Sequence, residues 1–183
     1  TLNIVRIGTS GSVQADIPVD SFVISEKSIG CDGVLRFYAN NESVCDHPFE
    51  EAFIRHCRWT PSAARPYVVN ADPGLVDRLY DEEHTIKGVT LTAVGFYGPQ
   101  GRVLRLPLAM PGINDRITAF RYEGYKVTNY EMESAAITGL CNLLGHRAAT
   151  ICLIIANRIN GDASADYHSY MNKLIRYTLE KLS

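Results

Sequence analysis

The longest apolar stretch of the chain covers residues 148–156, about nine residues of almost continuous hydrophobic character. This is far short of the roughly 20 residues that a helix needs to cross a bilayer, but it suits a strand that is buried on both faces. A second apolar stretch, 2–8, lies near the start of the chain. The two stretches together predict a fold built around a covered sheet.

Strand and helix patterns alternate between these stretches. Asp72-Pro73 is typical of a helix start, and Asn129 and Gly145 are suited to cap the two ends of one helix. Further strands are expected at 21–29, 33–38, 86–94 and 125–128, and helices at 48–58, 72–82, 114–121, 129–145 and 167–182. This alternation predicts an α/β fold. Because no repeat or linker interrupts the pattern, residues 1–183 are expected to form a single domain.

The charge balance indicates the kind of partner. Lys and Arg total 18 against 20 Asp and Glu, a net charge of -2, so there is no cationic field to hold nucleic acid or an acidic membrane surface. A small-molecule substrate is expected instead. The chain has five cysteines and no C-x-x-C pair, and no secretory signal pattern opens it, which favours reduced thiols in the cytoplasm.

Familiar catalytic signatures are absent. The sequence contains no G-x-x-x-x-G-K-[ST] and no H-E-x-x-H, and its His residues are scattered, so no metal site is expected. The segment Gly8-Thr9-Ser10-Gly11-Ser12 lacks the second Gly of a G-x-S-x-G nucleophile elbow.

Residues 6–11 read Arg-Ile-Gly-Thr-Ser-Gly at the end of the first apolar strand. An Arg6 guanidinium buried there needs an anion, and this edge of an α/β sheet is where ligands bind. Gly8 and Gly11 let backbone N–H groups approach the same anion, and Thr9 adds a hydroxyl. A structural ion pair between Arg6 and a carboxylate explains the segment equally well.

Three more segments could carry chemistry. In 96–102, Phe96, Gln100 and Arg102 could stack on and grip a planar heterocycle, although alone this segment reads as a solvated Gly/Pro turn. In 129–134, two carboxylates could accept hydrogen bonds from vicinal hydroxyls, or simply complement a helix dipole. In 155–158, polar residues follow an apolar strand.

In order along the chain, R-I-G-T-S-G, F-Y-x-x-Q-x-R, N-Y-E-M-E-S and A-N-R resemble the nucleoside phosphorylase family, and especially its uridine-cleaving members. The resemblance covers essentially the whole chain. It implies a three-layer α/β fold with a mixed, mostly buried sheet flanked by helices. It also implies phosphorolysis of uridine to uracil and ribose 1-phosphate in nucleoside catabolism and pyrimidine salvage. Inorganic phosphate would be the co-substrate, no cofactor would be needed, and the protein would be a homo-oligomer with dimers as the active unit.

The resemblance further implies a role for each motif residue. Phosphate would be bound by Arg6 and Thr9; ribose by Thr9, Glu131, Met132 and Glu133; and the base by Ser10, Gly11, Phe96, Gln100, Arg102, Ile155 and Arg158, with Arg6, Gln100 and Arg102 catalytic. Purine-cleaving relatives carry an acid near 156–158, which reads Ala-Asn-Arg here. A phosphorylase of another pyrimidine or purine nucleoside and a non-catalytic binding or storage member remain alternatives.

The sequence departs from the family pattern in three ways. Gly98-Pro99 precedes Gln100 where relatives place Gly, and Ser12 replaces a second glycine. The third departure is upstream, where no candidates precede Thr1 for the family's first phosphate loop, its second phosphate-binding arginine or the groups borrowed from a neighbouring subunit. We therefore expect the chain to correspond to the carboxyl-terminal portion of a longer phosphorylase domain.

Overall fold

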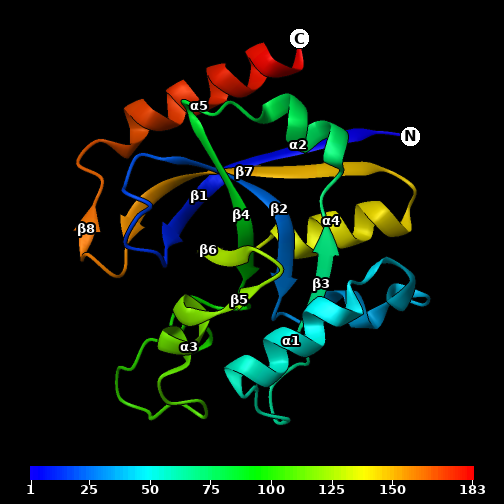
Figure 1. Cartoon of the computed structure of the whole chain (residues 1–183), viewed down its shortest axis with the longest axis vertical. Coiled ribbons are helices and arrows are strands. Elements are labelled where there is room, and N and C mark those ends of the chain that lie inside the picture. Colours follow the sequence, from blue (N-terminus) through cyan, green and yellow to red (C-terminus); the bar gives the residue numbers. More distant parts are fainter.

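The computed structural model describes all 183 residues and is built on a mixed sheet of eight strands (Figure 1). The strands are β1 (Asn3–Ser12), β2 (Phe22–Gly30), β3 (Tyr67–Asn70), β4 (Thr85–Thr92), β5 (Arg121–Tyr122), β6 (Tyr125–Glu131), β7 (Arg147–Asn157) and β8 (Asp162–Ala163). Their order is β3-β2-β4-β6-β1-β7-β8, with β5 on β6. Because β7 also pairs with β2, the strands β2, β4, β6, β1 and β7 form a closed ring.

The strand β7 explains why residues 148–156 are so apolar. It pairs in parallel with β1 along its whole length and antiparallel with β2 at 150–153. Residues 148–154 are buried, since neighbouring strands and helices cover them. The predicted buried strand is therefore confirmed.

Five α-helices lie on the outside of the sheet: α1 (His47–Cys57), α2 (Pro73–Leu79), α3 (Ile113–Ala119), α4 (Ser134–Leu143) and α5 (Tyr167–Leu182). In Figure 1, α2 and α5 lie together at one end and α1 and α3 at the other. Asp46, Asp72 and Asp166 cap α1, α2 and α5 by accepting backbone N–H groups of the first turn. None of these helices combines the length and apolar character needed to span a membrane.

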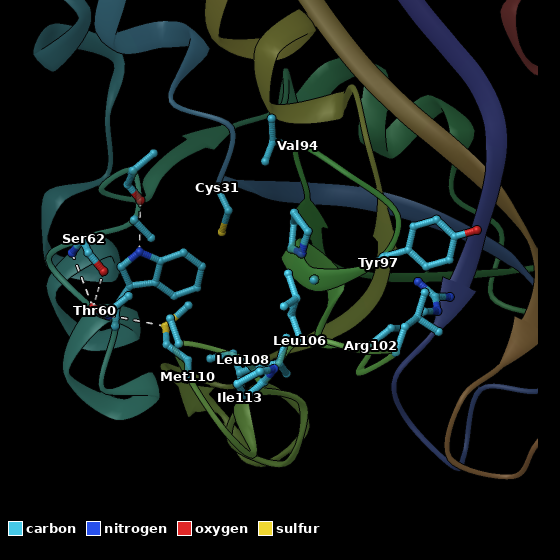
Figure 2. A pocket seen from close by; sticks show the side chains of 18 of the residues that line it. Cys31, Thr60, Ser62, Val94, Tyr97, Arg102, Leu106, Leu108, Met110 and Ile113 are labelled. Atoms are coloured by element: carbon cyan, nitrogen blue, oxygen red, sulfur yellow. Dashed lines mark hydrogen bonds between the residues drawn. The ribbon is translucent and has the colours of Figure 1, made fainter.

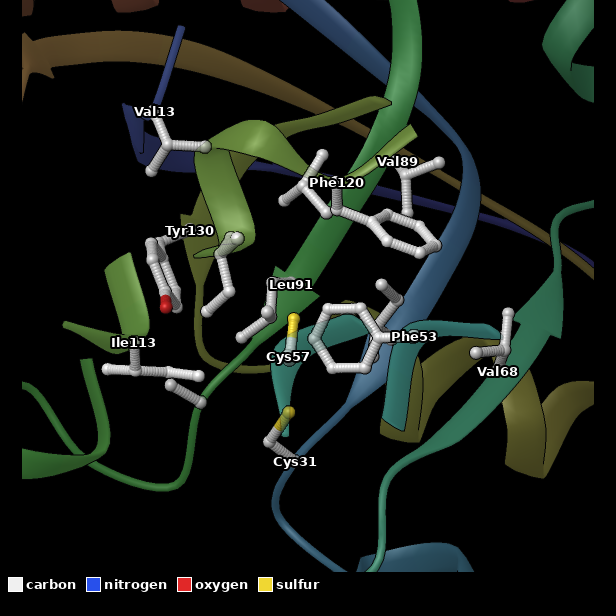
Figure 3. Packing of buried hydrophobic residues seen from close by; sticks show 14 of the residues in the cluster. Val13, Cys31, Phe53, Cys57, Val68, Val89, Leu91, Ile113, Phe120 and Tyr130 are labelled. Carbon is white, nitrogen blue, oxygen red and sulfur yellow. The ribbon is translucent and has the colours of Figure 1, made fainter. Parts of the chain in front are cut away.

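Two apolar clusters cover different parts of the sheet. The larger one packs Phe49 and Phe53 of α1 and Phe120, which follows α3, against strand residues including Val89 and Leu91 (Figure 3). The second packs α2 and α5 against Ile24 and β7. The expected α/β fold with a mixed sheet flanked by helices is confirmed.

Several boundaries differ from expectation. The strand expected at 33–38 is wrong: residues 34–37 form a 3-10 helix, because Gly33 is left-handed (φ 72) and the Asp32 carboxylate accepts from Val34 N at 3.0 Å. The short strand β3 has no counterpart among the expected strands. The helices expected at 72–82 and 114–121 are shorter and run over Pro73–Leu79 and Ile113–Ala119.

The helix expected from Asn129 is also wrong at its start, because α4 begins only at Ser134. Asn129 is buried in β6, where it accepts from Thr90 Oγ1 (3.0 Å) and Thr128 Oγ1 (2.8 Å) and donates to Ser10 Oγ (3.0 Å). Its side chain therefore joins three strands instead of capping a helix.

The strand β1 is less covered than its sequence suggests. Residues 3–10 pair only with β7, because β6 reaches β1 only at Gly11 and Ser12. Residues 4–9 are half-buried, although Val5 and Ile7 pack against the cluster beneath α5. The expectation that this strand is covered on both faces is therefore wrong for residues 4–9.

Candidate active site

All the candidate residues named from the sequence line one cavity of about 630 Å³. Its lining comes from the end of β1, the segment after β4, the junction of β6 with α4, and the end of β7. The residues are Arg6, Gly8, Thr9, Ser10, Gly11, Phe96, Gln100, Arg102, Tyr130, Glu131, Met132, Glu133, Ile155, Ala156, Arg158 and Met171. Antiparallel pairing of Gly11 with Tyr130 brings the ends of β1 and β6 together at this point.

Three lining residues have no role in the sequence-based expectations: Tyr130, Ala156 and Met171. Tyr130 and Ala156 lie inside the four motifs, so the motifs are the signal for them. Met171 comes from α5, where the sequence indicated only an apolar helix face. Ser12, the departure noted above, is fully buried and does not line the cavity.

Arg6 is held by acids at one end of the cavity. Its Nη1 lies 3.2 Å from Glu131 Oε2, its Nη2 pairs with the Glu133 carboxylate, and Nη1 also donates to Cys152 Sγ at 3.3 Å. Burial opposes the guanidinium charge, but Cys152, Glu131 and Glu133 outweigh it and raise the Arg6 pKa. The sequence left open whether Arg6 forms a structural ion pair or presents its charge to a ligand. In the structure it is ion-paired and also lines the cavity.

Gly8 makes room for this arrangement. A Cβ on Gly8 would lie 2.7 Å from Arg6 Nη1, well inside van der Waals contact. Residues 6 and 8 share one face of β1, so the Arg6 side chain folds along the strand over Gly8. The absent side chain therefore lets the guanidinium reach the cavity.

Glu131 is buried and fully engaged. Its Oε2 accepts from the backbone N–H groups of Glu133 and Ser134, both at 2.8 Å, and its Oε1 accepts from Thr92 Oγ1 at 2.5 Å. The Thr92 hydroxyl in turn accepts from Ala135 N at 2.9 Å. The carboxylate caps α4 from the end of β6. The sequence predicted that Glu131 and Glu133 lie within the helix, but in the structure both precede it.

Glu133 and Met132 are the exposed members of this junction. The Glu133 side chain is 54% exposed, and Met132 is 40% exposed. Both line the cavity. The junction therefore offers a ligand the Glu133 carboxylate, which Arg6 contacts through one oxygen, and the adaptable apolar side chain of Met132.

Cations surround Gln100 at the other end of the cavity. Gln100 Oε1 accepts from Arg102 Nη1 at 2.7 Å and from Arg158 Nη2. The two guanidiniums fix the orientation of the amide, so its NH₂ group is left without a protein partner. This end of the cavity therefore presents N–H donors and no carboxylate.

Each of the two guanidiniums lies over an aromatic ring. The Arg102 guanidinium carbon lies 3.9 Å from the centroid of the Phe96 ring, and that of Arg158 lies 4.5 Å from the centroid of the Tyr130 ring. Burial and the nearby Arg102 charge lower the Arg158 pKa to about 10, and burial lowers the Arg102 pKa. Two desolvated like charges favour an anionic or acceptor-rich group between them.

Asn157, the middle residue of A-N-R, faces away from the cavity. It is buried, and its Nδ2 donates to Gln14 O (2.9 Å) and Ile17 O (2.8 Å). Its role is to anchor the chain that follows β1.

A larger cavity of about 910 Å³ adjoins the site and shares Arg102 with it. Figure 2 shows Tyr97, Leu106 and Met110 around it. Its lining is mostly apolar, with Asp32 as its one carboxylate, and it contains neither Arg6 nor the two carboxylates of the smaller cavity. The smaller cavity is therefore the candidate active site.

Comparison with known proteins defines the class. Residues 2–178 match the sequence model of the Phosphorylase superfamily, so the chain belongs to that superfamily. Among its relatives, uridine phosphorylase A of Schistosoma mansoni is 36% identical over 160 residues, which cover 86% of this chain and 49% of that protein. Inactive uridine phosphorylase B of the same organism is 36% identical over 87 residues, covering 42% of this chain and 26% of that protein.

A solved structure is similar over nearly the whole chain. It is a Trypanosoma brucei nucleoside phosphorylase, described as showing uridine phosphorylase activity, with a TM-score of 0.84 and 24% identity over 98% of this chain and 63% of that one. This likeness confirms the fold. The chain spans about half the length of the uridine phosphorylases it matches, 47–53%.

Proposed function

We propose that this chain carries the active site of a uridine phosphorylase, which cleaves uridine with inorganic phosphate to give uracil and ribose 1-phosphate. The observation that supports this most is that one cavity brings Arg6 and two carboxylates together with the amide of Gln100 and the guanidiniums of Arg102 and Arg158. The proposed reaction uses phosphate as co-substrate and calls for no cofactor.

The end of the cavity with Gln100, Arg102 and Arg158 suits uracil. Gln100 Nε2 and the remaining N–H groups of Arg102 and Arg158 can donate to the carbonyl oxygens of a uracil ring. The 4-amino group of cytosine is itself a donor and could not accept from these N–H groups. When the glycosidic bond breaks, negative charge develops on the base. The two guanidiniums bind that charge more tightly than neutral uridine, which is transition-state stabilisation.

The acidic end suits the sugar and phosphate. Glu133 can accept from the two vicinal ribose hydroxyls, with Met132 and Glu131 beside it. Arg6 and the Thr9 hydroxyl can hold phosphate next to C1′. The phosphate charge then supports the positive charge that develops on the sugar, and its fixed position supplies rate.

The purine alternative has less support. Asn157 is buried against backbone carbonyls, and its neighbour Arg158 is a cation. No carboxyl group at this position can protonate or bind N7 of a purine. We therefore propose a pyrimidine nucleoside, used in salvage and catabolism.

We further propose a homo-oligomer with dimers as the active unit, in the cytoplasm. Beside the site, Val94, Val103, Leu104 and Leu106 are 62–80% exposed, and a cluster of this kind is typical of an interface. All five cysteines are free, which favours a reducing compartment.

One assay tests the proposed function. The protein is incubated with uridine, thymidine, cytidine or inosine, with and without phosphate, and free base is measured. We expect uracil release that requires phosphate and that is lost in Arg6→Gln. The matched control is Arg176→Gln, which changes an exposed arginine on α5 outside both cavities and should keep the activity. Equal release without phosphate would contradict phosphorolysis, inosine cleavage would support the purine alternative, and binding without turnover would indicate a non-catalytic member.

A further inference from the structure

The turn that carries Gln100 and Arg102 has little support of its own. It lies in the segment between β4 and α3 and consists of one 3-10 turn, Gly98–Gln100, followed by Gly101 at φ 70. Its internal hydrogen bonds run from Gln100 N and Arg102 N to Tyr97 O, both at 3.0 Å, and from Gly101 N to Gly98 O at 2.9 Å. Residues 103–107, which follow, are exposed. Contacts from outside this segment must therefore fix the turn.

Asn114 supplies such contacts. Its Nδ2 donates to Gln100 O at 3.1 Å and to Gly101 O at 3.4 Å. Its Oδ1 accepts from the Tyr130 hydroxyl at 3.2 Å. One amide thus ties the base-binding turn to α3, on which Asn114 lies, and to β6, on which Tyr130 lies.

The packing at Gly101 shows how close this contact is. A Cβ on Gly101 would lie 2.5 Å from Asn114 Nδ2, and the positive φ also disfavours a side chain there. Both the backbone conformation and the approach of the Asn114 amide therefore require glycine.

Tyr130 closes a circuit of contacts around Gln100. Its buried ring carries the Arg158 guanidinium, and Arg158 donates both to the Gln100 side chain and to Gln100 O at 3.2 Å. Its hydroxyl holds Asn114, which donates to the same carbonyl. Tyr130 is also the residue before Glu131, so the acidic and cationic ends of the cavity share one strand.

We propose that Asn114 and Tyr130 are positioning residues: the Tyr130 hydroxyl orients the Asn114 amide, which holds the Gln100–Arg102 turn in the geometry that binds the base. The effect on substrate rests on the proposed function. The effect on the turn does not, and the two can be measured separately.

The test uses Asn114→Ala and Tyr130→Phe. The matched control is Asn142→Ala, which also removes an amide donor to a backbone carbonyl, Asn70 O at 3.0 Å, but on α4 outside the cavity. Residue-resolved amide hydrogen exchange is measured at Gly101 and Arg102 without any ligand. We expect about five- to tenfold faster exchange in Asn114→Ala, a smaller increase in Tyr130→Phe, and no change in the control.

The second readout is substrate binding. In Asn114→Ala, kcat/KM for uridine should fall about tenfold while the KM for phosphate stays within twofold of wild type. Exchange at Gly101 and Arg102 within twofold of wild type would overturn the proposal, as would a uniform increase over the whole sheet. If Asn114→Ala does not fold, Tyr130→Phe decides alone. If the wild-type protein neither binds nor cleaves uridine, the proposed function fails, and the exchange data still decide whether the turn is held in this way.

Discussion

The guanidinium of Arg6 is ion-paired with the carboxylate of Glu133. In the proposed reaction Arg6 binds phosphate and Glu133 binds ribose, so without substrates each residue satisfies the other. Arg6 is largely buried while the Glu133 side chain is 54% exposed, so Glu133 is the partner that is free to move. Phosphate and Glu133 must therefore share or compete for the same N–H groups.

The variant Glu133→Gln should move the two substrate affinities in opposite directions. Uridine binding should weaken about 10- to 100-fold, because the ribose hydroxyls lose a charged acceptor. Phosphate binding should strengthen several-fold, because Arg6 no longer faces a competing charge. Calorimetric titration with each substrate alone measures both effects.

Glu51→Gln is the control for that variant, since it removes an exposed carboxylate paired with Arg65 away from the cavity. It should change neither affinity. Weaker phosphate binding in Glu133→Gln would show that the carboxylate supports Arg6 more than it competes for it.

The variant Arg102→Ala should lower kcat by roughly 10²–10³, the effect of losing one preorganised stabiliser of developing charge. Arg158 and Gln100 remain, so some base binding is retained. Steady-state kinetics with Arg176→Ala, an exposed arginine outside the cavity, as the control measures the change. An increase in KM with kcat unchanged would count against a role in the transition state.

The variant Thr92→Val should destabilise the fold by about 1–3 kcal/mol, because Glu131 loses a donor and the buried Ala135 N–H loses its acceptor. Urea unfolding measures this. Thr178→Val is the control: its buried hydroxyl donates only to Leu174 O within α5, so the cost should stay below about 1 kcal/mol. Equal effects in both variants would show that the α4 junction is not specially dependent on Thr92.

His47 should make stability depend on pH. Its bond to Glu50, aided by Glu42, raises the His47 pKa above 6.5, so the protonated ring stabilises the folded state. That contribution is present below about pH 6.5 and is lost as the pH rises through the raised pKa. Unfolding free energies of wild type and His47→Gln should therefore differ more at about pH 5.5 than at about pH 8.5, within the ~0.2–1 kcal/mol typical of exposed pairs. The difference should shrink in about 1 M salt; a larger difference at the higher pH would contradict this.

Much of the fold follows from local patterns. The apolar run at 148–156 becomes β7, and Asp72-Pro73 starts α2 as expected. The closure of the sheet could not be predicted, because it depends on pairing between β2 and β7, far apart in the chain. The short strand β3 exists through its pairing with β2 and has little signal of its own.

The site was predictable to a different degree at each residue. Arg6 could be proposed from a cation at a strand end. Gln100 could be proposed as a group that binds a heterocycle, although its segment alone fits a solvated turn better, and Arg158 was assigned a role only through the family resemblance. Asn129 fits a helix cap as well as a strand, and only Thr90 and Ser10, from other strands, decide between them. Met171 enters the cavity through the packing of α5, which an apolar helix face alone does not orient.

Residues 3–10 of β1 have a strand on one side only, and they include Arg6 and Thr9. The N–H and C=O groups along its other edge gain nothing from a second ladder, so local opening should be easier here than in β7. An anion bound by Arg6 and Thr9 would also stabilise this strand. A ligand that binds only the ordered form shifts the equilibrium between the open and ordered states toward the ordered one. Phosphate binding at the proposed site and the order of residues 3–10 are thus thermodynamically linked.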